Sequence, residues 1–356
     1  MEETKKKKVL IIYNHLIHYR IPITKLLAEK CDLTVVYSLG SDPKEEFNFK
    51  VIKLPVIKFN RFVIHKTNLY KICQNFDVVI AYGDIAWLKL SGLAFRKKRR
   101  FKLLFWTIGV SASYDKKFDA VSRWDSVRDL FYKKADGLIF YTDYPIQKYI
   151  SRGYKENKLF VAPNTVEVFQ GEKAKMNNKD IILFIGTLYM QKGILSLLEN
   201  YKFAYDINQN IFPLIIIGGG PEFEEINSWI TNNQLHEKVY LKGPIYDVNV
   251  KAEYFQRSLA CISPFQAGLT VLESMGYGVP FITMFDAITG GERLNIVNNI
   301  NGILMQKSDE LRDILLDISN NEDKYIIMGA NALKKYNSSR TPMHMANGLF
   351  EAINNV

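Results

Sequence analysis

Three segments in the second half of the chain combine glycines with polar or charged side chains in patterns that suit an anionic ligand. In the first, Gly186 and Thr187 follow a β-rich run at 181–185, and Lys192 stands just before a helical stretch. Glycine lets backbone N–H groups approach a ligand, and lysine adds a point charge. The segment is not a Walker loop, because its spacing to Lys192 is wrong and no Ser or Thr follows that lysine. An ordinary strand-to-helix turn with a surface lysine is an equal alternative.

The second segment, 214–221, is a buried-type strand that ends in three glycines, Gly219 among them, and a proline. It differs from a dinucleotide fingerprint, which needs a glycine where Phe223 stands. The segment therefore predicts only a tight turn at the carboxyl end of a parallel strand, on the side of the sheet where ligands bind.

The third segment, 263–280, predicts a short helix that begins near Gly268. The free N–H groups of Leu269 and Thr270 would then form an anion site. Glu273 lies one turn further along the same face and leans toward that site. A phosphate would repel this carboxylate, so we expect Glu273 to accept hydrogen bonds from neutral hydroxyls such as those of ribose. The alternative is a helix carboxylate held in a salt bridge.

Positive charge is concentrated in the first half of the chain. Residues 1–165 hold 31 Lys and Arg against 16 Asp and Glu, whereas residues 166–356 hold 16 against 21. The run Arg96–Arg100, flanked by Phe95 and Phe101, predicts contact with an anionic membrane surface. A solvated loop is the alternative. Nucleic-acid binding is disfavoured, because no recognised motif accompanies the run.

The elements that must position these residues form a pattern that occurs twice. A length of 356 residues predicts about two domains. Short apolar runs alternate with amphipathic stretches, which is typical of parallel sheets wrapped by helices. The strands are expected at 9–13, 33–37, 78–81, 103–107, 138–141 and 159–162, and then at 181–185, 214–217, 239–241, 260–263, 281–283 and 302–304. The polar stretch 166–180 predicts a linker. We expect a first domain at 1–165 with 338–356, and a second at 181–337.

The chain's last helix is expected to pack back on the first domain, with residues 337–339 capping its start. The three scattered cysteines fit neither a metal site nor a disulfide scaffold, so a reducing compartment is the default. The first apolar run is too short for a signal peptide, and no apolar stretch reaches the 18 residues or so that span a bilayer.

Taken in order, these segments resemble those of the family 4 retaining glycosyltransferases of bacterial surface-polysaccharide type. The resemblance implies an α/β fold of GT-B architecture, with two Rossmann-like doubly wound domains facing a central cleft and a C-terminal helix returning to the N-terminal domain. It rests on residues 186–193, 218–221, 239–243, 268–280, 289–292 and 301–302, and in the first half on 105–109, 135–139 and 162–166.

The resemblance implies a nucleotide-sugar donor, UDP- or GDP-linked, held without a metal. Lys192 and the backbone at 268–270 would bind the donor diphosphate, and Glu273 would hold the ribose. The loop Gly243, Pro244 and Ile245 would lie against the base. Lys192 and Glu273 are thus the expected catalytic residues, and Gly186 and Gly219 belong to the same donor site.

Three positions depart from the family pattern. Phe265 stands where the family commonly has a glutamate that contacts the donor sugar, Thr187 replaces an arginine, and Ile108 replaces a histidine. Gln266 and Thr187 are the neutral hydrogen-bonding groups that we expect to substitute.

The first domain must then hold the acceptor, a glycan or a polyprenyl-linked molecule. His15, His18 and Arg20 follow the first strand, where open α/β sheets bind ligands, and a histidine is a plausible proton acceptor. Histidines bonded to backbone at a helix start are the alternative. Gly109 is a second candidate for the acceptor wall.

The expected protein is therefore a cytoplasmic hexosyltransferase, peripheral at the inner face of the membrane, that builds a cell-surface polysaccharide such as capsule or O-antigen. A nucleotide-sugar epimerase or phosphorylase of the same architecture remains an alternative. So does a non-catalytic protein that binds nucleotide sugars or nucleic acid.

Overall fold

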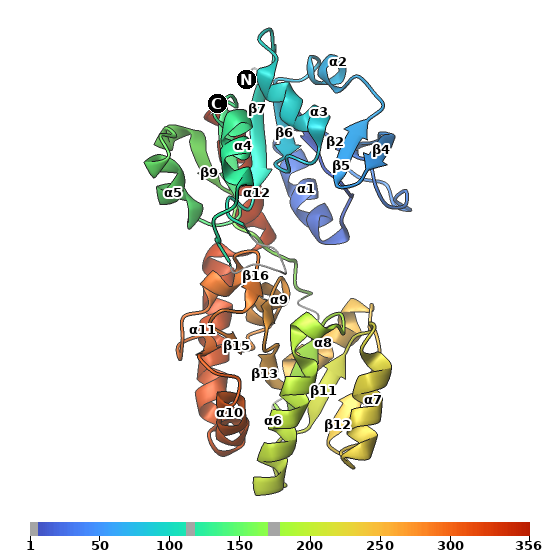
Figure 1. The fold of residues 1–356 in the computed structure, drawn as a ribbon, viewed down its shortest axis with the longest axis vertical. Coiled ribbons are helices and arrows are strands. Elements are labelled where there is room, and N and C mark those ends of the chain that lie inside the picture. Colours follow the sequence, from blue (N-terminus) through green and yellow to red (C-terminus); the bar gives the residue numbers. More distant parts are fainter. Residues whose placement is uncertain (1–5, 112–117, 170–178) are drawn as a thin grey trace. The chain divides into compact units, whose positions relative to one another are not determined.

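The computed structural model describes residues 6–111, 118–169 and 179–356, and this part of the chain divides into two compact units. The first unit holds 6–111, 120–164 and 342–356, and the second holds 118–119, 165–169 and 179–341 (Figure 1). Residues 170–178 of the predicted linker lie outside the described residues. The described ends of that linker pack on the second unit, where Val168 lies against Gly276 and Asp180 pairs with Arg257.

The first unit is built on a seven-stranded parallel sheet. Its order is β3 (Lys50–Lys53), β2 (Asp32–Tyr37), β1 (Lys8–Ile12), β6 (Val78–Tyr82), β7 (Lys102–Thr107), β8 (Gly137–Phe140) and β9 (Leu159–Val161). The central strands are buried on both faces and rich in Val, Ile and Leu, which is why they read as continuous apolar runs. The chain order reverses between β1 and β6, so the carboxyl ends of these two strands flank the switch point where ligands bind.

Helices cover both faces of this sheet (Figure 1). One face carries α1 (Ile21–Ala28), entered through the 3-10 turn η1 (His18–Arg20), and α12 (Pro342–Asn354). The other carries α2 (Leu69–Cys73), α3 (Leu88–Gly92) with η2 (Leu93–Phe95), α4 (Trp124–Tyr132) and α5 (Pro145–Ser151), while η3 (Glu156–Lys158) leads into β9.

The return of the C-terminal helix to the first unit is confirmed. A Cβ at Gly348 would lie 2.3 Å from the carbonyl oxygen of Val161, so glycine permits the close approach of α12 to β9. The predicted cap at 337–339 is wrong, because α11 (Glu322–Ser339) continues through these residues. The last helix starts at Pro342, and proline fits a first helical position because its missing N–H has no partner there in any case.

No strand was predicted from the sequence between residues 38 and 77. The structure has β3 there, followed by an antiparallel hairpin of β4 (Val56–Phe59) and β5 (Phe62–His65). The signal was present, since two short β-rich runs flank the pair Asn60 and Arg61, and Asn60 adopts a φ of 52° that asparagine tolerates.

The second unit repeats the doubly wound scheme. Its parallel sheet has the order β12 (Val239–Leu241), β11 (Leu214–Ile217), β10 (Ile181–Ile185), β13 (Ser258–Ile262), β15 (Phe281–Met284) and β17 (Gly302–Met305). Its helices are α6 (Ile194–Ile207), α7 (Phe223–Asn232), α8 (Val248–Arg257), α9 (Thr270–Gly276), α10 (Glu310–Asn320) and α11, with 3-10 turns η4 (Met190–Lys192) and η5 (Glu292–Asn295). A small parallel pair joins β14 (Gln266–Ala267) to β16 (Ile288–Thr289).

The predicted fold class, two Rossmann-like doubly wound units, is confirmed. Each expected strand lies within two residues of an observed one. In the second unit the chain order reverses between β10 and β13, and all three glycine segments follow strands at the carboxyl edge near this point. None of the helices in the described ranges is both long and apolar enough to cross a bilayer.

Candidate functional site

The loops that follow β10, β11 and β12 are hydrogen-bonded into one surface at the carboxyl edge of the second sheet. Gly186 N donates to Ile217 O at 3.0 Å, and Gly218 N donates to Gly243 O at 2.9 Å. Gly218 has a φ of 153°, and a Cβ there would lie 1.8 Å from the carbonyl oxygen of Gly186. Only glycine permits this approach of two backbones, so the first two glycine segments act as one structural feature.

Lys192 closes the first loop and points back over its beginning. A Cβ at Gly186 would lie 3.3 Å from Lys192 Nζ, so the ammonium group sits directly beside that glycine turn. The lysine is only 7% exposed, and its side chain forms no ion pair or hydrogen bond with any described residue. Burial lowers the pKa of Lys192, which means that the surroundings do not compensate its charge. An anion bound at this turn would compensate it.

The loop after β13 is attached to the Lys192 loop at two points. Phe265 N donates to Lys192 O at 3.4 Å, and a Cβ at Gly193 would lie 2.5 Å from the Phe265 ring. The Tyr189 hydroxyl donates a short hydrogen bond to Gln266 Oε1. Tyr189 was not among the expected site residues, because nothing in the sequence links it to a residue 77 positions away.

The third glycine segment has the predicted local structure. The helix α9 starts at Thr270 with Leu269 as its N-cap, and the Cβ position of Gly268 meets nothing within 4 Å. The first N–H groups of a helix have no partner within it. The space beside Gly268 is therefore open toward the free N–H groups of this short helix.

Glu273 lies on α9 and pairs with a lysine that the sequence analysis did not single out. Lys251 Nζ of α8 lies 2.5 Å from Glu273 Oε1, with the two side chains 25% and 14% exposed. The structure thus shows the salt bridge that was the alternative interpretation of Glu273. A bond through one carboxylate oxygen fixes the side chain and leaves lone pairs to accept hydrogen bonds from a ligand.

Two charged side chains of the site act on one buried thiol, that of Cys261 in β13. Burial raises the pKa of Cys261, Glu273 raises it further, and Lys192 lowers it. The charges of both predicted catalytic residues therefore act on the same strand next to the switch point.

The remaining predicted donor residues lie on the same edge. A Cβ at Gly219 would lie 3.6 Å from Pro244, so the loop at 243–245 rests against the turn after β11. Ile245 is half-buried and Thr187 is exposed. Contacts thus link the predicted donor residues in the segments after β10, β11, β12 and β13, and the residues at 268–273 follow β14 on the same side of the second unit.

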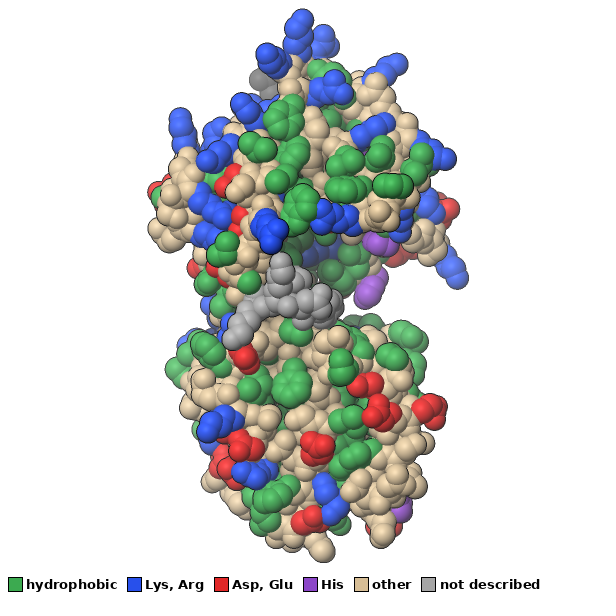
Figure 2. Space-filling view, in the orientation of Figure 1, with side chains coloured by type: hydrophobic (Ala, Val, Ile, Leu, Met, Phe, Trp, Pro, Cys, Tyr) green, Lys and Arg blue, Asp and Glu red, His purple; other side chains and the backbone are tan. Residues whose placement is uncertain are grey.

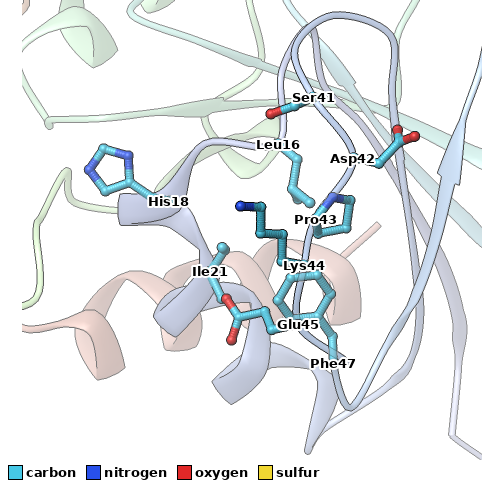
Figure 3. Close-up of a pocket in the computed structure, with 9 residues that line it drawn as sticks. All are labelled: Leu16, His18, Ile21, Ser41, Asp42, Pro43, Lys44, Glu45 and Phe47. Atoms are coloured by element: carbon cyan, nitrogen blue, oxygen red, sulfur yellow. The ribbon is translucent and has the colours of Figure 1, made fainter.

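The first unit has a hollow at the carboxyl edge of its own sheet. Its volume is about 330 Å³, and His18 is one of the residues that line it. Figure 3 shows Lys44 lying across the middle of the hollow, with His18 and Asp42 on opposite sides of it. The other lining residues are Leu16, Ile21, Ser41, Pro43, Glu45 and Phe47. His15 is exposed and pairs with Leu39 through a β-bridge outside this lining.

Arg20 and Gly109 lie inside the first unit. The Arg20 guanidinium, 6% exposed, donates to Asn164 Oδ1 at 3.0 Å and to Met345 Sδ at 2.8 Å. It also stacks on the rings of Tyr19, Trp106 and Tyr141. Gly109 is buried with a φ of 79° and packs on Phe140 and Pro145. These contacts favour structural roles for both residues.

Residues 165–335, which span nearly all of the second unit, match the family model described as glycosyl transferases group 1. The matched residues make up just under half of the chain. The site assembled around Lys192, Gly186 and Glu273 lies wholly within the matched residues.

A relative of the chain is also described as a glycosyltransferase. An uncharacterized glycosyltransferase of Methanocaldococcus jannaschii is 23% identical over 306 residues, with 80% of this chain and 75% of the relative covered. The chain is thus similar to a glycosyltransferase over most of its length, and its second unit is similar to glycosyl transferases group 1.

Solved structures confirm the GT-B fold across the chain. HepE of Anabaena, solved in complex with UDP, aligns with a TM-score of 0.75 at 15% identity and covers 98% of this chain and 100% of HepE. A glycosyltransferase of Rickettsia africae aligns with a TM-score of 0.72 at 16% identity, with 98% of each chain covered. TarM of S. aureus, in complex with UDP, alpha-GlcNAc-glycerol and fondaparinux, aligns with a TM-score of 0.69 at 12% identity and covers 98% and 100% of the two chains.

Proposed function

We propose that this protein transfers a hexose from a UDP- or GDP-linked donor to a glycan or lipid-linked acceptor, with retention of the anomeric configuration, as family 4 enzymes do. The observation that carries the proposal is Lys192, a buried cation without a carboxylate partner among the described residues, placed over a glycine turn at the switch point of the sheet. A diphosphate supplies the missing negative charge. The solved structures of HepE and TarM with UDP support a nucleotide donor at a fold of this kind.

In this proposal the donor diphosphate lies between Lys192 Nζ and the N–H groups at 268–270. Glu273, held by Lys251, accepts hydrogen bonds from the ribose, and the loop at 243–245 lies against the base. The acceptor hydroxyl attacks on the face that the diphosphate leaves, and the departing phosphate takes its proton. Fixed positive charge stabilises the leaving group, so the reaction requires no metal.

Phe265 changes the donor-sugar end of the site. Its ring packs on the backbone of Gly193, in the place where the family commonly has a carboxylate. An apolar ring accepts no hydrogen bond from a sugar hydroxyl. We therefore propose that Gln266, which Tyr189 holds through a hydrogen bond, is the neutral group that contacts the sugar.

The acceptor would bind the first unit, where the hollow beside His18 offers Lys44, Asp42 and Phe47 to a polar glycan. We place the protein at the cytoplasmic face of a membrane, in cell-surface polysaccharide synthesis, with the Arg96–Arg100 region toward anionic lipid. Neither the domain match nor the relative favours the epimerase and nucleic-acid-binding alternatives.

The test is thermal stabilisation and calorimetric binding with UDP, GDP and their sugars. Lys192→Met is expected to raise the dissociation constant of the preferred nucleotide diphosphate by roughly thirtyfold, since a charge-assisted bond contributes about 2 kcal/mol.

Lys179→Met is the matched control. Lys179 is a second lysine of the same unit whose pKa burial lowers, to about 8, and its Nζ donates to Ser258 O at 2.7 Å at the amino end of β13. The Lys179→Met variant should leave the affinity for the nucleotide diphosphate unchanged. Equal affinity in the Lys192 variant and the unaltered protein would end the proposal, as would a failure of every nucleotide to bind.

A further inference from the structure

The β4–β5 hairpin of the first unit turns large apolar side chains to the solvent. Ile57 pairs across the hairpin with Ile64, and Phe59 pairs with Phe62. Ile57 is 53% exposed, Ile64 37% and Phe59 70%, and Phe62 is half-buried. These four residues, the hairpin ladder, form one continuous outward face, because alternate residues of a strand share a side.

The opposite face of the hairpin is less apolar than the exposed one. Val63 and His65 of β5 point inward and are 8% and 0% exposed. A register shift of one residue would have buried the isoleucines and phenylalanines and freed the histidine. A fold that buries His65 and leaves Phe59 in solvent loses hydrophobic stabilisation. Such an arrangement is expected where the exposed apolar face binds a partner.

The ladder is held in a fixed position. The Arg61 guanidinium at the hairpin tip lies 3.9 Å from the centre of the Trp124 ring of α4, and Val63 N donates to Ala86 O at 2.8 Å. Trp124 itself is 39% exposed and extends the apolar surface beyond the hairpin. The exposed rings are therefore presented by a rigid surface and not by a frayed end.

The charges around the ladder indicate the kind of partner. Residues 47–76 include the hairpin and hold six Lys and Arg but no Asp or Glu, and residues 85–111 hold seven and again none. The two stretches meet where β5 contacts α3. Figure 2 shows hydrophobic side chains on this face of the first unit with Lys and Arg side chains around them. A surface that combines exposed apolar side chains with surrounding positive charge is complementary to a partner that is apolar in one part and negatively charged in another.

The second stretch contains a built basic hollow. Its loop at 96–100 is held because the Tyr70 hydroxyl donates to Lys98 O at 2.7 Å and Arg100 N donates to Gln74 Oε1 at 2.9 Å. The hollow has a volume of about 500 Å³, and its lining includes Arg96, Lys97, Arg99, Arg100, Lys102 and Lys134 against one carboxylate, Asp136. Asp136 pairs with Arg99 and Lys102. The other cations of the hollow have no acidic partner among the described residues. A phosphate group fits such a lining.

We infer that this face of the first unit docks on an anionic lipid bilayer, with the hairpin ladder inserted among the acyl chains and the hollow at 96–100 holding a lipid phosphate. The inference deepens the proposed function, since it rests on that function for the lipid-linked acceptor. Apolar insertion and charge attraction add in membrane binding, and each cation near an anionic surface contributes about 1 kcal/mol.

The experiment is cosedimentation of the full chain with vesicles of phosphatidylcholine alone and of phosphatidylcholine mixed with phosphatidylglycerol. Ile57→Ser with Phe59→Ser is expected to lower partition onto the mixed vesicles at least about tenfold. Ile207→Ser with Ile327→Ser is the matched control, because these two isoleucines of the second unit are each 62% exposed and should not affect partition.

A charge variant separates the two components. Lys97→Gln with Arg100→Gln should weaken binding to the mixed vesicles roughly fivefold per charge and reduce its salt dependence. Binding of UDP is measured in every variant, so loss of membrane binding with intact UDP affinity is attributed to this surface alone.

Several results would overturn the inference. Partition of the ladder variant equal to that of the unaltered chain is one, and equal partition onto both kinds of vesicle is another. A dimer in light scattering that the ladder variant converts to monomer would assign the face to a second copy. Salt-dependent binding to duplex DNA without vesicle binding would assign the charges to nucleic acid.

Discussion

His65 makes the stability of the first unit dependent on pH. Its side chain is fully buried, its Nδ1 has no hydrogen-bond partner, and its Nε2 lies 3.2 Å from Ser38 Oγ. The Trp87 ring lies 5.3 Å away, and the charge of Lys89 acts in the same direction as burial. Burial lowers the pKa of His65 from 6.5 to about 4. The folded unit therefore favours the neutral imidazole.

The sign of the effect follows from the two pKa values. The unfolded chain binds a proton near pH 6.5 while the folded chain resists it until about pH 4, so the contribution to stability is complete above pH 6.5 and is lost as the pH falls toward 4. At about 1.4 kcal/mol per pKa unit the full effect is about 3 kcal/mol, of which roughly 2.5 kcal/mol falls between pH 7.5 and 4.5.

The assay is urea unfolding at those two pH values, followed by tryptophan fluorescence. Three of the four tryptophans lie in the first unit, so the signal reports mainly its unfolding. His65→Gln cannot take up a proton and retains a group that bonds to Ser38. Its loss of stability on acidification should be smaller than that of the unaltered chain by about 2.5 kcal/mol. The exposed His236 provides the control variant, His236→Gln. An equal loss in the unaltered chain and the His65 variant would refute the reasoning.

Further predictions concern the donor site. Glu273→Gln should weaken UDP about tenfold but leave 2′,3′-dideoxy-UDP unaffected, and calorimetry showing equal losses would exclude ribose as its ligand. Lys251→Met should lower the stability of the second unit by about 2 kcal/mol in a urea titration, with partial recovery in the double variant Lys251→Met, Glu273→Gln, because removing one partner strands a largely buried carboxylate. Gly218→Ala should cost roughly 3 kcal/mol, since its Cβ would overlap a backbone oxygen, whereas Gly92→Ala meets open space and should be neutral in the same titration. Sugar transfer should continue in excess EDTA, and activity that depends on added Mg²⁺ would contradict a site in which Lys192 and the N–H groups at 268–270 stabilise the diphosphate.

The framework of the site is predictable from the sequence because its signals are local. Strand, glycine turn and helix are adjacent in the chain, so the positions of Lys192, Gly219 and Gly268 at the carboxyl edge follow once a parallel sheet is expected. The placement of the last helix on the first unit was also expected, as part of the resemblance to the GT-B architecture. The hairpin at 56–65 was missed, although its turn residues are readable, since its exposed face is the more apolar one and breaks the usual pattern.

Tertiary structure decided the partners of these residues. The pairing of Glu273 with Lys251, the bond from Tyr189 to Gln266 and the contact of Phe265 with Gly193 each join residues that are separated along the chain. Arg20, expected at the acceptor side, is buried against Asn164 and Met345 for the same reason.

The sequence by itself therefore determined the two doubly wound sheets and the edge of each sheet at which ligands bind, because the period of apolar residues and the glycine turns are encoded over a few positions. Which side chains meet at those edges, and which way each face of a hairpin points, depends on packing between distant elements. That packing alone shows that Lys192 is buried without a counter-charge from any residue that the structure describes, and that Phe59 is left in solvent.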